Sequence, residues 1–267
     1  MMSNFYSTCI DNFLEDPDKL VDFSKKLPWK PTPGNFPGTR TPAFHDINED
    51  LNTYLSLKIL SVYFDFNIQE NIDNVTWDKS QIYFQKVKKF SNKVKSSFNK
   101  GWIHKDNEQL AFVIYLNKNI PDVAGTNVYT LKENVDEDYL RQKMKWNMML
   151  KHWFYTGKDV KENEYKNSIE EIENYFDESI LFKPRYNRLV VYGQDFHSAN
   201  NYWMPNEEER FFIVGFMNGI KCKNFPLQRI KNKVIDKNIK KNLVIKKLLS
   251  SQKMIKGNVY DKIAFRK

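Results

Sequence analysis

The sequence has few cysteines and no long apolar run. Only Cys9 and Cys222 occur in the 267 residues, and their placement matches neither a disulfide framework nor a zinc knuckle. The first ten residues lack the basic segment and the sustained apolar stretch of a secretory signal, and no stretch approaches the length of a membrane span. We therefore expect a soluble, unsecreted protein of a reducing, cytoplasmic compartment with no membrane partner.

The composition allows a sizeable core but excludes little else. Hydrophobic residues make up 41% of the chain and charged residues 28%, which suits one large β-rich domain or a domain with extensions.

One short motif brings together side chains that could bind a metal. His104 and Asp106 are two residues apart, so in a strand both would point to one face while Lys105 turns away. Far downstream, His197 follows Gln-Asp-Phe and could complete the set. Two imidazoles and one carboxylate form the facial triad of non-heme Fe(II) sites, which leaves positions open for other ligands. His-x-Asp alone is a weak motif, so the surrounding residues decide.

Four segments near these residues are predicted to be strands. Each is short, dense in aromatic and β-branched residues, and bounded by turn residues. They are residues 110–117, 125–131, 187–192 and 210–217. The last begins with Arg210, and a buried guanidinium at that position would need an anionic partner.

The order of these motifs resembles that of the 2-oxoglutarate- and Fe(II)-dependent dioxygenases, most closely the prolyl-4-hydroxylase-like branch with its short viral and bacterial members. The resemblance runs through residues 5–220, with its specific motifs in 101–131 and 186–217, and residues 11–23 are similar to the opening helix of these chains. It implies a mainly β (α+β) fold with flanking helices, in which a double-stranded β-helix forms a jelly-roll or cupin-like barrel with iron at its mouth.

The resemblance also assigns roles to residues. It implies that His104, Asp106 and His197 are the iron ligands and catalytic residues, that Arg210 holds the far carboxylate of 2-oxoglutarate, and that Tyr115 and Asn117 help to bind this cosubstrate. The interval from His197 to Arg210 is longer than the family commonly shows, so Arg185 and Arg188 remain alternatives for the clamp.

The implied cofactors are Fe(II), 2-oxoglutarate and O2. The implied reaction is hydroxylation of a C–H bond in a peptidyl (prolyl-like) or amino-acid substrate, with release of succinate and CO2. The alternative is a barrel that retains the metal but acts as a binding module, associated with nucleic acid through a basic tail.

Three further regions have a distinct composition. Residues 28–44 are rich in proline and glycine and are predicted to form a loop over the barrel mouth, where Arg40 is either a solvated residue, the favoured interpretation, or a substrate contact. Residues 133–183 are predicted to be a helical insertion in a domain of residues 1–227. His45 and His152 are expected to have structural or exposed positions rather than to bind metal.

Residues 228–267 form a basic C-terminal extension. They hold thirteen Lys or Arg residues and two Asp, a net charge of +11, so with +9 for the whole chain the remainder carries −2. Such a segment could make weak contact with polyanions, or it could be a solvated lysine-rich helix.

Overall fold

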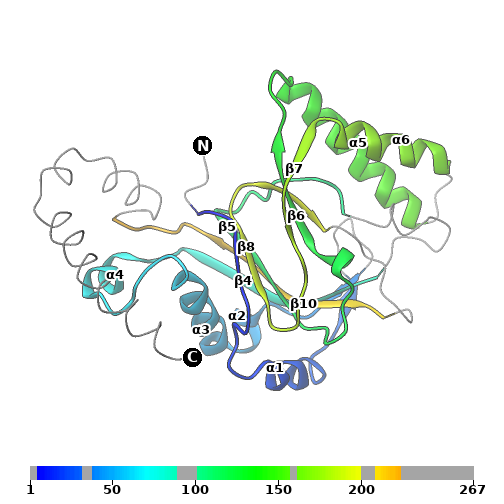
Figure 1. The fold of residues 1–267 in the computed structure, drawn as a ribbon. Coiled ribbons are helices and arrows are strands. Elements are labelled where there is room, and N and C mark those ends of the chain that lie inside the picture. Colours follow the sequence, from blue (N-terminus) through cyan, green and yellow to red (C-terminus); the bar gives the residue numbers. More distant parts are fainter. Residues whose placement is uncertain (1–4, 32–37, 89–100, 157–160, 200–207, 224–267) are drawn as a thin grey trace, which may run out of the picture. The chain divides into compact units, whose positions relative to one another are not determined.

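Two antiparallel sheets form the centre of the protein (Figure 1). The computed structural model describes residues 5–31, 38–88, 101–156, 161–199 and 208–223. Within these ranges, the large sheet has the strand order β1-β8-β5-β10-β4-β3-β2 and the small sheet the order β7-β6-β9. The fold is thus mixed helix and antiparallel sheet. No ladder between the described strands joins the two sheets, so a closed barrel is not part of the described structure.

The strands differ greatly in length between the centre and the edges of each sheet. The large sheet contains β1 (Thr8–Ile10), β2 (Lys30–Pro31), β3 (Gly38–Arg40), β4 (Lys79–Val87), β5 (Leu110–Tyr115), β8 (Leu189–Tyr192) and β10 (Arg210–Asn218). The small sheet contains β6 (Thr126–Leu131), β7 (Phe176–Phe182) and β9 (Phe196–Ala199).

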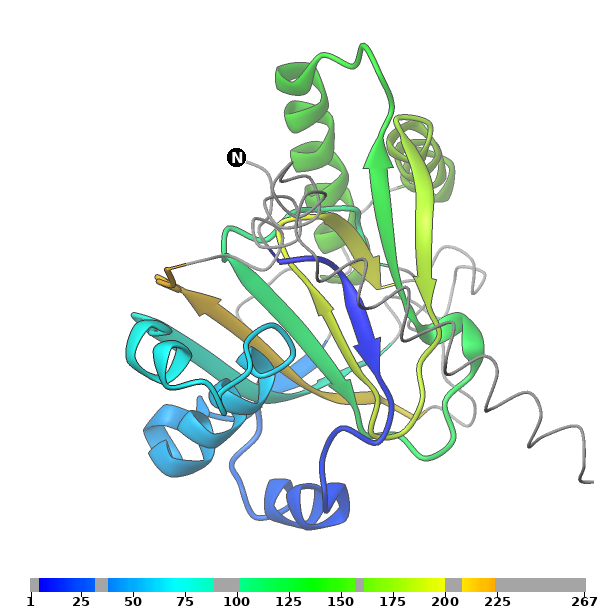
Figure 2. The same ribbon diagram turned by 60° about the vertical axis from the view of Figure 1, so that its left-hand side comes forward.

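The central strands are apolar because both of their faces are covered. All six residues of β5 are buried. One face of the large sheet packs against the helices α2 (Phe44–Ile47) and α3 (Glu49–Leu60), and Figures 1 and 2 show α2, α3 and α4 (Gln69–Asn74) beside it. The other face shares a core cluster with Val128 and Phe182 of the small sheet. The cavity described below lies between these two layers.

Local signals explain where several helices begin. α1 (Pro17–Ser24) starts with proline after Asp16, whose side chain accepts a hydrogen bond from the Lys19 backbone N–H at 3.2 Å. Asn48 caps α3 in the same way through Leu51, at 2.9 Å. None of the helices in the described part of the chain is both long and apolar enough to cross a bilayer.

Two helices lie within residues 133–183, where a helical insertion was predicted. α5 (Glu137–Thr156) and α6 (Glu162–Glu173) pair with each other beside the small sheet, after the short 3-10 helix η2 (Asp122–Ala124). Residues 176–182, however, form strand β7 rather than helix. Its two phenylalanines are buried at its ends and the five residues between them are exposed, so it lacks the apolar run by which the other strands were recognised.

Two local predictions were wrong. His104 and Asp106 do not lie on a regular strand: His104 makes an isolated bridge to His197, and Asp106 follows in irregular backbone. Residues 28–44 are not wholly a loop, because β2, β3 and the start of α2 lie there, although residues 32–37 are outside the described ranges. In both places, the backbone conformation depends on pairing with a distant strand. The local sequence does not reveal such pairing.

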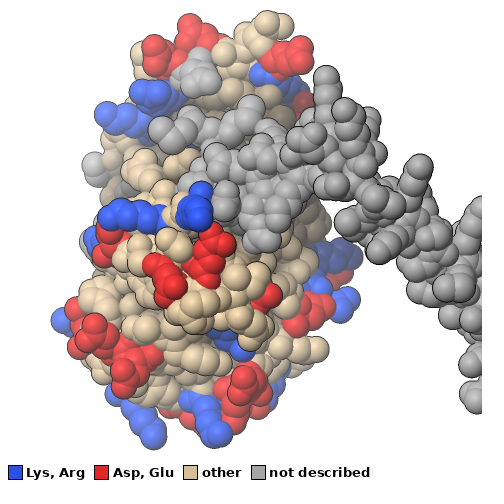
Figure 3. Space-filling model, turned by 90° about the vertical axis from the view of Figure 1, so that its left-hand side faces the viewer, with Lys and Arg blue, Asp and Glu red and all other residues tan. Residues whose placement is uncertain are grey.

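Charged side chains of both signs are interspersed on the face shown in Figure 3. This agrees with the near-neutral charge of the chain without its basic extension. The extension itself, residues 228–267, lies outside the described residues.

Candidate metal centre

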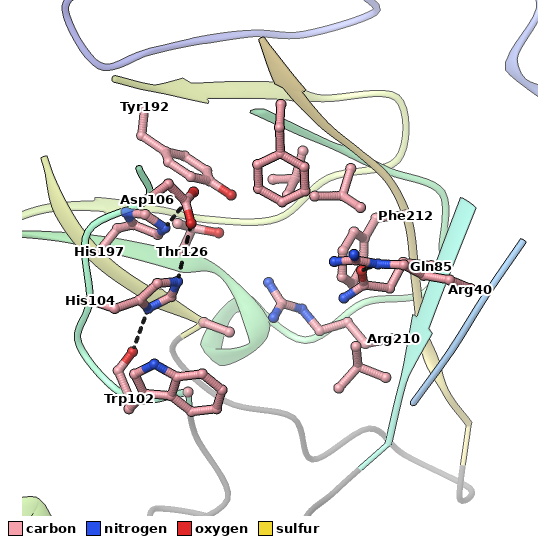
Figure 4. Close-up of a pocket in the computed structure, with 16 residues that line it drawn as sticks. Arg40, Gln85, Trp102, His104, Asp106, Thr126, Tyr192, His197, Arg210 and Phe212 are labelled. Carbon is pink, nitrogen blue, oxygen red and sulfur yellow. Dashed lines mark hydrogen bonds and ion pairs between the residues drawn. The ribbon is translucent and has the colours of Figure 1, made fainter. Parts of the chain in front are cut away.

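Three side chains from distant parts of the chain meet at one point. The potential ligand atoms of His104, Asp106 and His197 all lie within 4.8 Å of one another, and these residues form the one such group found in the described part of the chain. Asp106 Oδ1 lies 3.7 Å from His104 Nε2, and Asp106 Oδ2 lies 3.4 Å from His197 Nε2 (Figure 4). The three residues predicted as ligands are therefore brought together.

The backbone holds the two histidines side by side. The N–H of His104 donates to the carbonyl of His197 at 3.0 Å, and the N–H of His197 donates back at 2.9 Å. This pair of bonds ties the segment before Asp106 to β9 of the small sheet. It replaces the regular strand expected for the His-x-Asp motif, and it sets the two imidazole rings with their centroids 4.4 Å apart.

Each imidazole is oriented by a carbonyl two residues before it. His104 Nδ1 lies 2.9 Å from the Trp102 carbonyl, and His197 Nδ1 lies 2.9 Å from the Asp195 carbonyl. A carbonyl can only accept, so in a neutral ring the proton is on Nδ1 and the lone pair is on Nε2. Both lone pairs then face Asp106, as metal-binding histidines require.

The electrostatics favour the protonation states of metal ligands. Burial, together with the neighbouring His197, lowers the pKa of His104 to about 4, so that its ring is neutral at neutral pH. For Asp106, burial alone would raise the pKa, but His197, His104 and Arg40 outweigh it and the pKa is lowered. The centre therefore presents a neutral imidazole at His104 and a carboxylate at Asp106.

These residues fit a divalent transition metal. Asp106 Oδ2 is buried and has no hydrogen-bond partner in the structure, although it lies close to His197. A bare buried carboxylate oxygen is costly unless a cation or a donor compensates it. Two nitrogens and one oxygen on one side of a metal are the donor set that suits Fe(II) and leaves further positions open.

A cavity of about 360 Å³ adjoins the three ligands. Figure 4 shows its two arginines on the side opposite the histidines. Polar side chains gather there among aromatic ones; besides the three ligands, the lining includes Arg40, Gln85, Thr126, Arg210, Trp102, Tyr192, Phe212 and Phe216. A metal in this centre would thus face a cavity that carries positive charge.

Arg210 is held firmly within this cavity. Only 2% of the residue is exposed, and its Nη2 donates to the Gly125 carbonyl at 3.0 Å and to the Tyr115 hydroxyl at 3.4 Å. The Tyr115 hydroxyl also lies 2.7 Å from Thr126 Oγ1. Gly125 itself packs closely against β7, since a Cβ there would lie 2.3 Å from the Phe182 carbonyl oxygen. The Tyr115 hydroxyl and the Gly125 carbonyl therefore orient the guanidinium of Arg210.

The other predicted cosubstrate residues have different positions. Asn117 does not line the cavity; its amide donates to the Glu209 carbonyl at 3.0 Å and accepts from the Phe211 N–H at 2.6 Å, so it fixes the start of β10. The alternative clamps Arg185 and Arg188 also lie outside the cavity lining, where both pair with Asp11. Of the arginines suggested for the clamp, Arg210 is the one that the structure places in the cavity.

Sequence reasoning missed several residues of the cavity. Arg40 was favoured as a solvated loop residue, but it ends strand β3 and lines the cavity beside Gln85 of β4. Residues 79–87 were not predicted as a strand, although Ile82, Tyr83 and Phe84 are the β-favouring residues that could have revealed it. The remaining histidines lie elsewhere: His45 is in α2, near Asp46, and His152 is in α5.

A second hollow of about 870 Å³ is also lined by His104. It lies between the small sheet and α5, and its lining includes Lys105, Tyr129, Arg141 and Phe196. His104 therefore lines two spaces that could each admit a ligand.

The fold and the site together define a β-rich protein with a candidate metal centre beside a cationic cavity. The chain belongs to a family of unknown function, DUF6445, whose model matches residues 6–203. No curated protein matches the chain.

Solved structures similar to this chain include several oxygenases. A prolyl hydroxylase from Trichoplax adhaerens, in complex with a peptide fragment, has 12% identity and a TM-score of 0.43, with 80% of this chain and 83% of that chain covered. HygX from Streptomyces hygroscopicus, with nickel and 2-oxoglutarate bound, has 11% identity and a TM-score of 0.45, with 79% and 82% covered. A 2OG-Fe(II) oxygenase family protein from Burkholderia pseudomallei has 9% identity and a TM-score of 0.40, with 84% and 87% covered. Because these TM-scores lie below 0.5, the case for the chemistry rests on the side chains of this chain.

Proposed function

We propose that this protein is an Fe(II)- and 2-oxoglutarate-dependent dioxygenase of the double-stranded β-helix class. It would hydroxylate a C–H bond of a peptidyl or amino-acid substrate while 2-oxoglutarate and O2 are converted to succinate and CO2. The observation that carries the proposal is the convergence of His104, Asp106 and His197 within 4.8 Å beside a cavity that holds a buried arginine. The order of the sequence motifs, from the metal ligands to Arg210, supports it.

The protein residues would bind and orient the reactants. His104, Asp106 and His197 would hold Fe(II), which with 2-oxoglutarate and O2 supplies the oxidising chemistry when bound. Arg210 would pair with the far carboxylate of 2-oxoglutarate through charge-assisted hydrogen bonds, with its guanidinium positioned by Tyr115 and Gly125. Trp102, Tyr192 and Phe212 line the cavity and would exclude water from the reactants.

Two measurements on the purified full chain test this proposal. Fe(II) binding should be detected by calorimetry under anaerobic conditions, and succinate should form from 2-oxoglutarate when Fe(II) and air are supplied. Asp106→Ala should remove the anionic ligand, weaken Fe(II) binding and eliminate succinate formation. His45→Ala is the matched control, because His45 lies on α2 away from the centre and should leave both measurements unchanged.

The outcomes separate the proposal from its alternative. Wild-type metal binding without any succinate would favour a binding module that retains a metal. If Asp106→Ala binds Fe(II) and forms succinate as the wild type does, the assignment of the metal centre is wrong.

A further inference from the structure

The cavity contains a second arginine, which the proposed cosubstrate site does not use. Arg40 lies opposite Gln85 in the pairing of β3 with β4, and Gln85 lies opposite Phe212 of β10. Arg210 is two residues from Phe212 on the same strand, and side chains two apart point to the same face. Arg40 and Arg210 therefore rise from the same face of the large sheet, with β4 between their strands.

The two guanidinium groups serve different parts of the cavity. Arg210 reaches toward Gly125 and Tyr115. The guanidinium of Arg40 lies over the rings of Tyr83 and Phe216, with its central carbon 5.0 Å and 5.7 Å from their centroids. Figure 4 also draws the two side chains apart, with Arg40 beside Gln85. We would thus not expect a single anionic group bound by Arg210 to pair with Arg40 as well.

Arg40 has the features of a prepared anion-binding group. Its Nε donates to Gln85 Oε1, which sets the plane of the guanidinium, and the guanidinium also packs against the two rings. A guanidinium fixed in this way presents a planar fork that matches a carboxylate. Burial lowers the pKa of Arg40, which means that the charge has lost solvation, and an anion in the cavity would restore part of it.

Arg40 also lies close enough to the metal centre to act on a substrate there. It lines the same cavity as the three ligands, and so does Phe216, whose ring centroid lies 5.7 Å from the central carbon of its guanidinium. A ligand held by Arg40 would therefore extend toward the metal. The volume of about 360 Å³ is near the lower end of the range for small-molecule sites, about 300–1,000 Å³, so a substrate sharing it with 2-oxoglutarate must be small within the cavity.

We propose that Arg40 and Gln85 form a substrate-recognition site for a carboxylate, so that the substrate is an amino acid or the C-terminal residue of a peptide rather than an internal peptide residue. This inference rests on the proposed function, since it assumes that Arg210 is occupied by 2-oxoglutarate. The carboxylate would pair with the fork of Arg40, and the rest of the molecule would reach toward the ligands.

Calorimetry on the full chain loaded with Ni(II) tests the two sites separately. 2-Oxoglutarate is titrated first; if it does not bind the wild type, the proposed function fails and not only this inference. The complex is then titrated with matched pairs of probes: free L-amino acids and their amides, and short peptides with free or amidated C-termini. We expect at least one carboxylate probe to bind about 10- to 100-fold more tightly than its amide. The two kinds of pair distinguish a free amino acid from a peptide C-terminus.

Variants then assign the preference to a residue. Arg40→Gln should remove the preference for carboxylates while 2-oxoglutarate binds as in the wild type, and Arg40→Lys should retain the preference with weaker binding. Arg185→Gln is the matched control, because this exposed arginine pairs with Asp11 outside the cavity. Thermal melting checks that each variant is folded. If Arg40→Gln does not fold, the comparison of Arg40→Lys with the wild type tests the inference.

Three results would overturn the inference. The first is that no probe pair shows a preference for the carboxylate in the wild type. The second is that Arg40→Gln weakens 2-oxoglutarate binding, which would make Arg40 part of the cosubstrate clamp. The third is that Arg141→Gln, in the second hollow, removes the preference while Arg40→Gln keeps it.

Discussion

In the large sheet, the charged side chains that face the cavity are the cations Arg40 and Arg210, whereas the small sheet and the segment bridged to it present His197, His104 and Asp106. The cations stand on strands whose pairing is regular, with Arg210 opposite Val87 and Arg40 opposite Gln85. The metal-binding candidates come from a four-residue strand and an irregular segment. One layer would thus bind anions and the other the metal. Substitutions in the large sheet should therefore weaken anion binding, and substitutions in the small sheet should weaken metal binding.

The largest effect is expected in the small sheet. His197→Ala removes a buried imidazole whose Nε2 faces Asp106. Loss of a partner beyond the ligands already costs about 10- to 100-fold in metal affinity, so loss of a ligand should exceed about 100-fold and abolish turnover. Calorimetry with Fe(II) measures this, with circular dichroism to confirm folding. If the variant binds Fe(II) as tightly as the wild type does, the assignment of metal binding to the small sheet is wrong.

A smaller and different effect is expected in the large sheet. Arg210→Ala removes the proposed partner of the far carboxylate, so the Michaelis constant for 2-oxoglutarate should rise about 10- to 100-fold while Fe(II) binding is retained. Succinate formation at varied 2-oxoglutarate measures it. Arg188→Ala is the control, because this arginine pairs with Asp11 outside the cavity. If the Michaelis constant for 2-oxoglutarate rises in the Arg188 variant and not in the Arg210 variant, Arg188 is the residue that binds the far carboxylate.

The sequence predicted continuous buried strands better than strands with exposed residues, for a physical reason. Residues 110–117 and 210–217 are apolar because helices and a second sheet bury both faces, and such runs are recognisable. β7, in contrast, has exposed residues between its two phenylalanines. Its position depends on pairing with β6, where the register shifts between Val128 and Tyr129, and no local pattern records that pairing.

The candidate site could be predicted in its residue types but not in its backbone. The spacing of His104 and Asp106 suggested a strand, yet what brings them to His197 is one isolated bridge. Arg40 was underrated because its segment is rich in proline and glycine, and only the pairing of β3 with β4 turns it into the cavity. The candidate ligands were therefore recognisable from residue identity, while the long-range pairing that brings them together was not.

The pH dependence of the metal-free protein tests the burial of the metal centre. The pKa of His104 is lowered from 6.5 to about 4, so the unfolded chain takes up a proton at a higher pH than the folded chain does. Stability should be complete above about pH 6.5 and fall as the pH decreases toward about 4. Since 34% of the side chain is exposed, solvent screening reduces the effect to about 1–2 kcal/mol.

Urea unfolding of the metal-free protein at several pH values between about 4 and 7 measures this change. His104→Leu should flatten the dependence, because no proton is then taken up at this position. An unchanged slope in that variant would mean that other groups cause the loss of stability.

The smallest effect on the folded domain is expected from the basic extension. Removal of residues 228–267 takes away a net charge of +11 and leaves −2, so salt-sensitive binding to heparin or DNA should be largely lost. Both sheets and the candidate metal centre are formed by residues before this segment, so the melting temperature and succinate formation should not change. Heparin affinity at several salt concentrations measures the effect. If the shortened chain binds with the same salt dependence, polyanion contact belongs to the domain, where charges of both signs are mixed on the face in Figure 3.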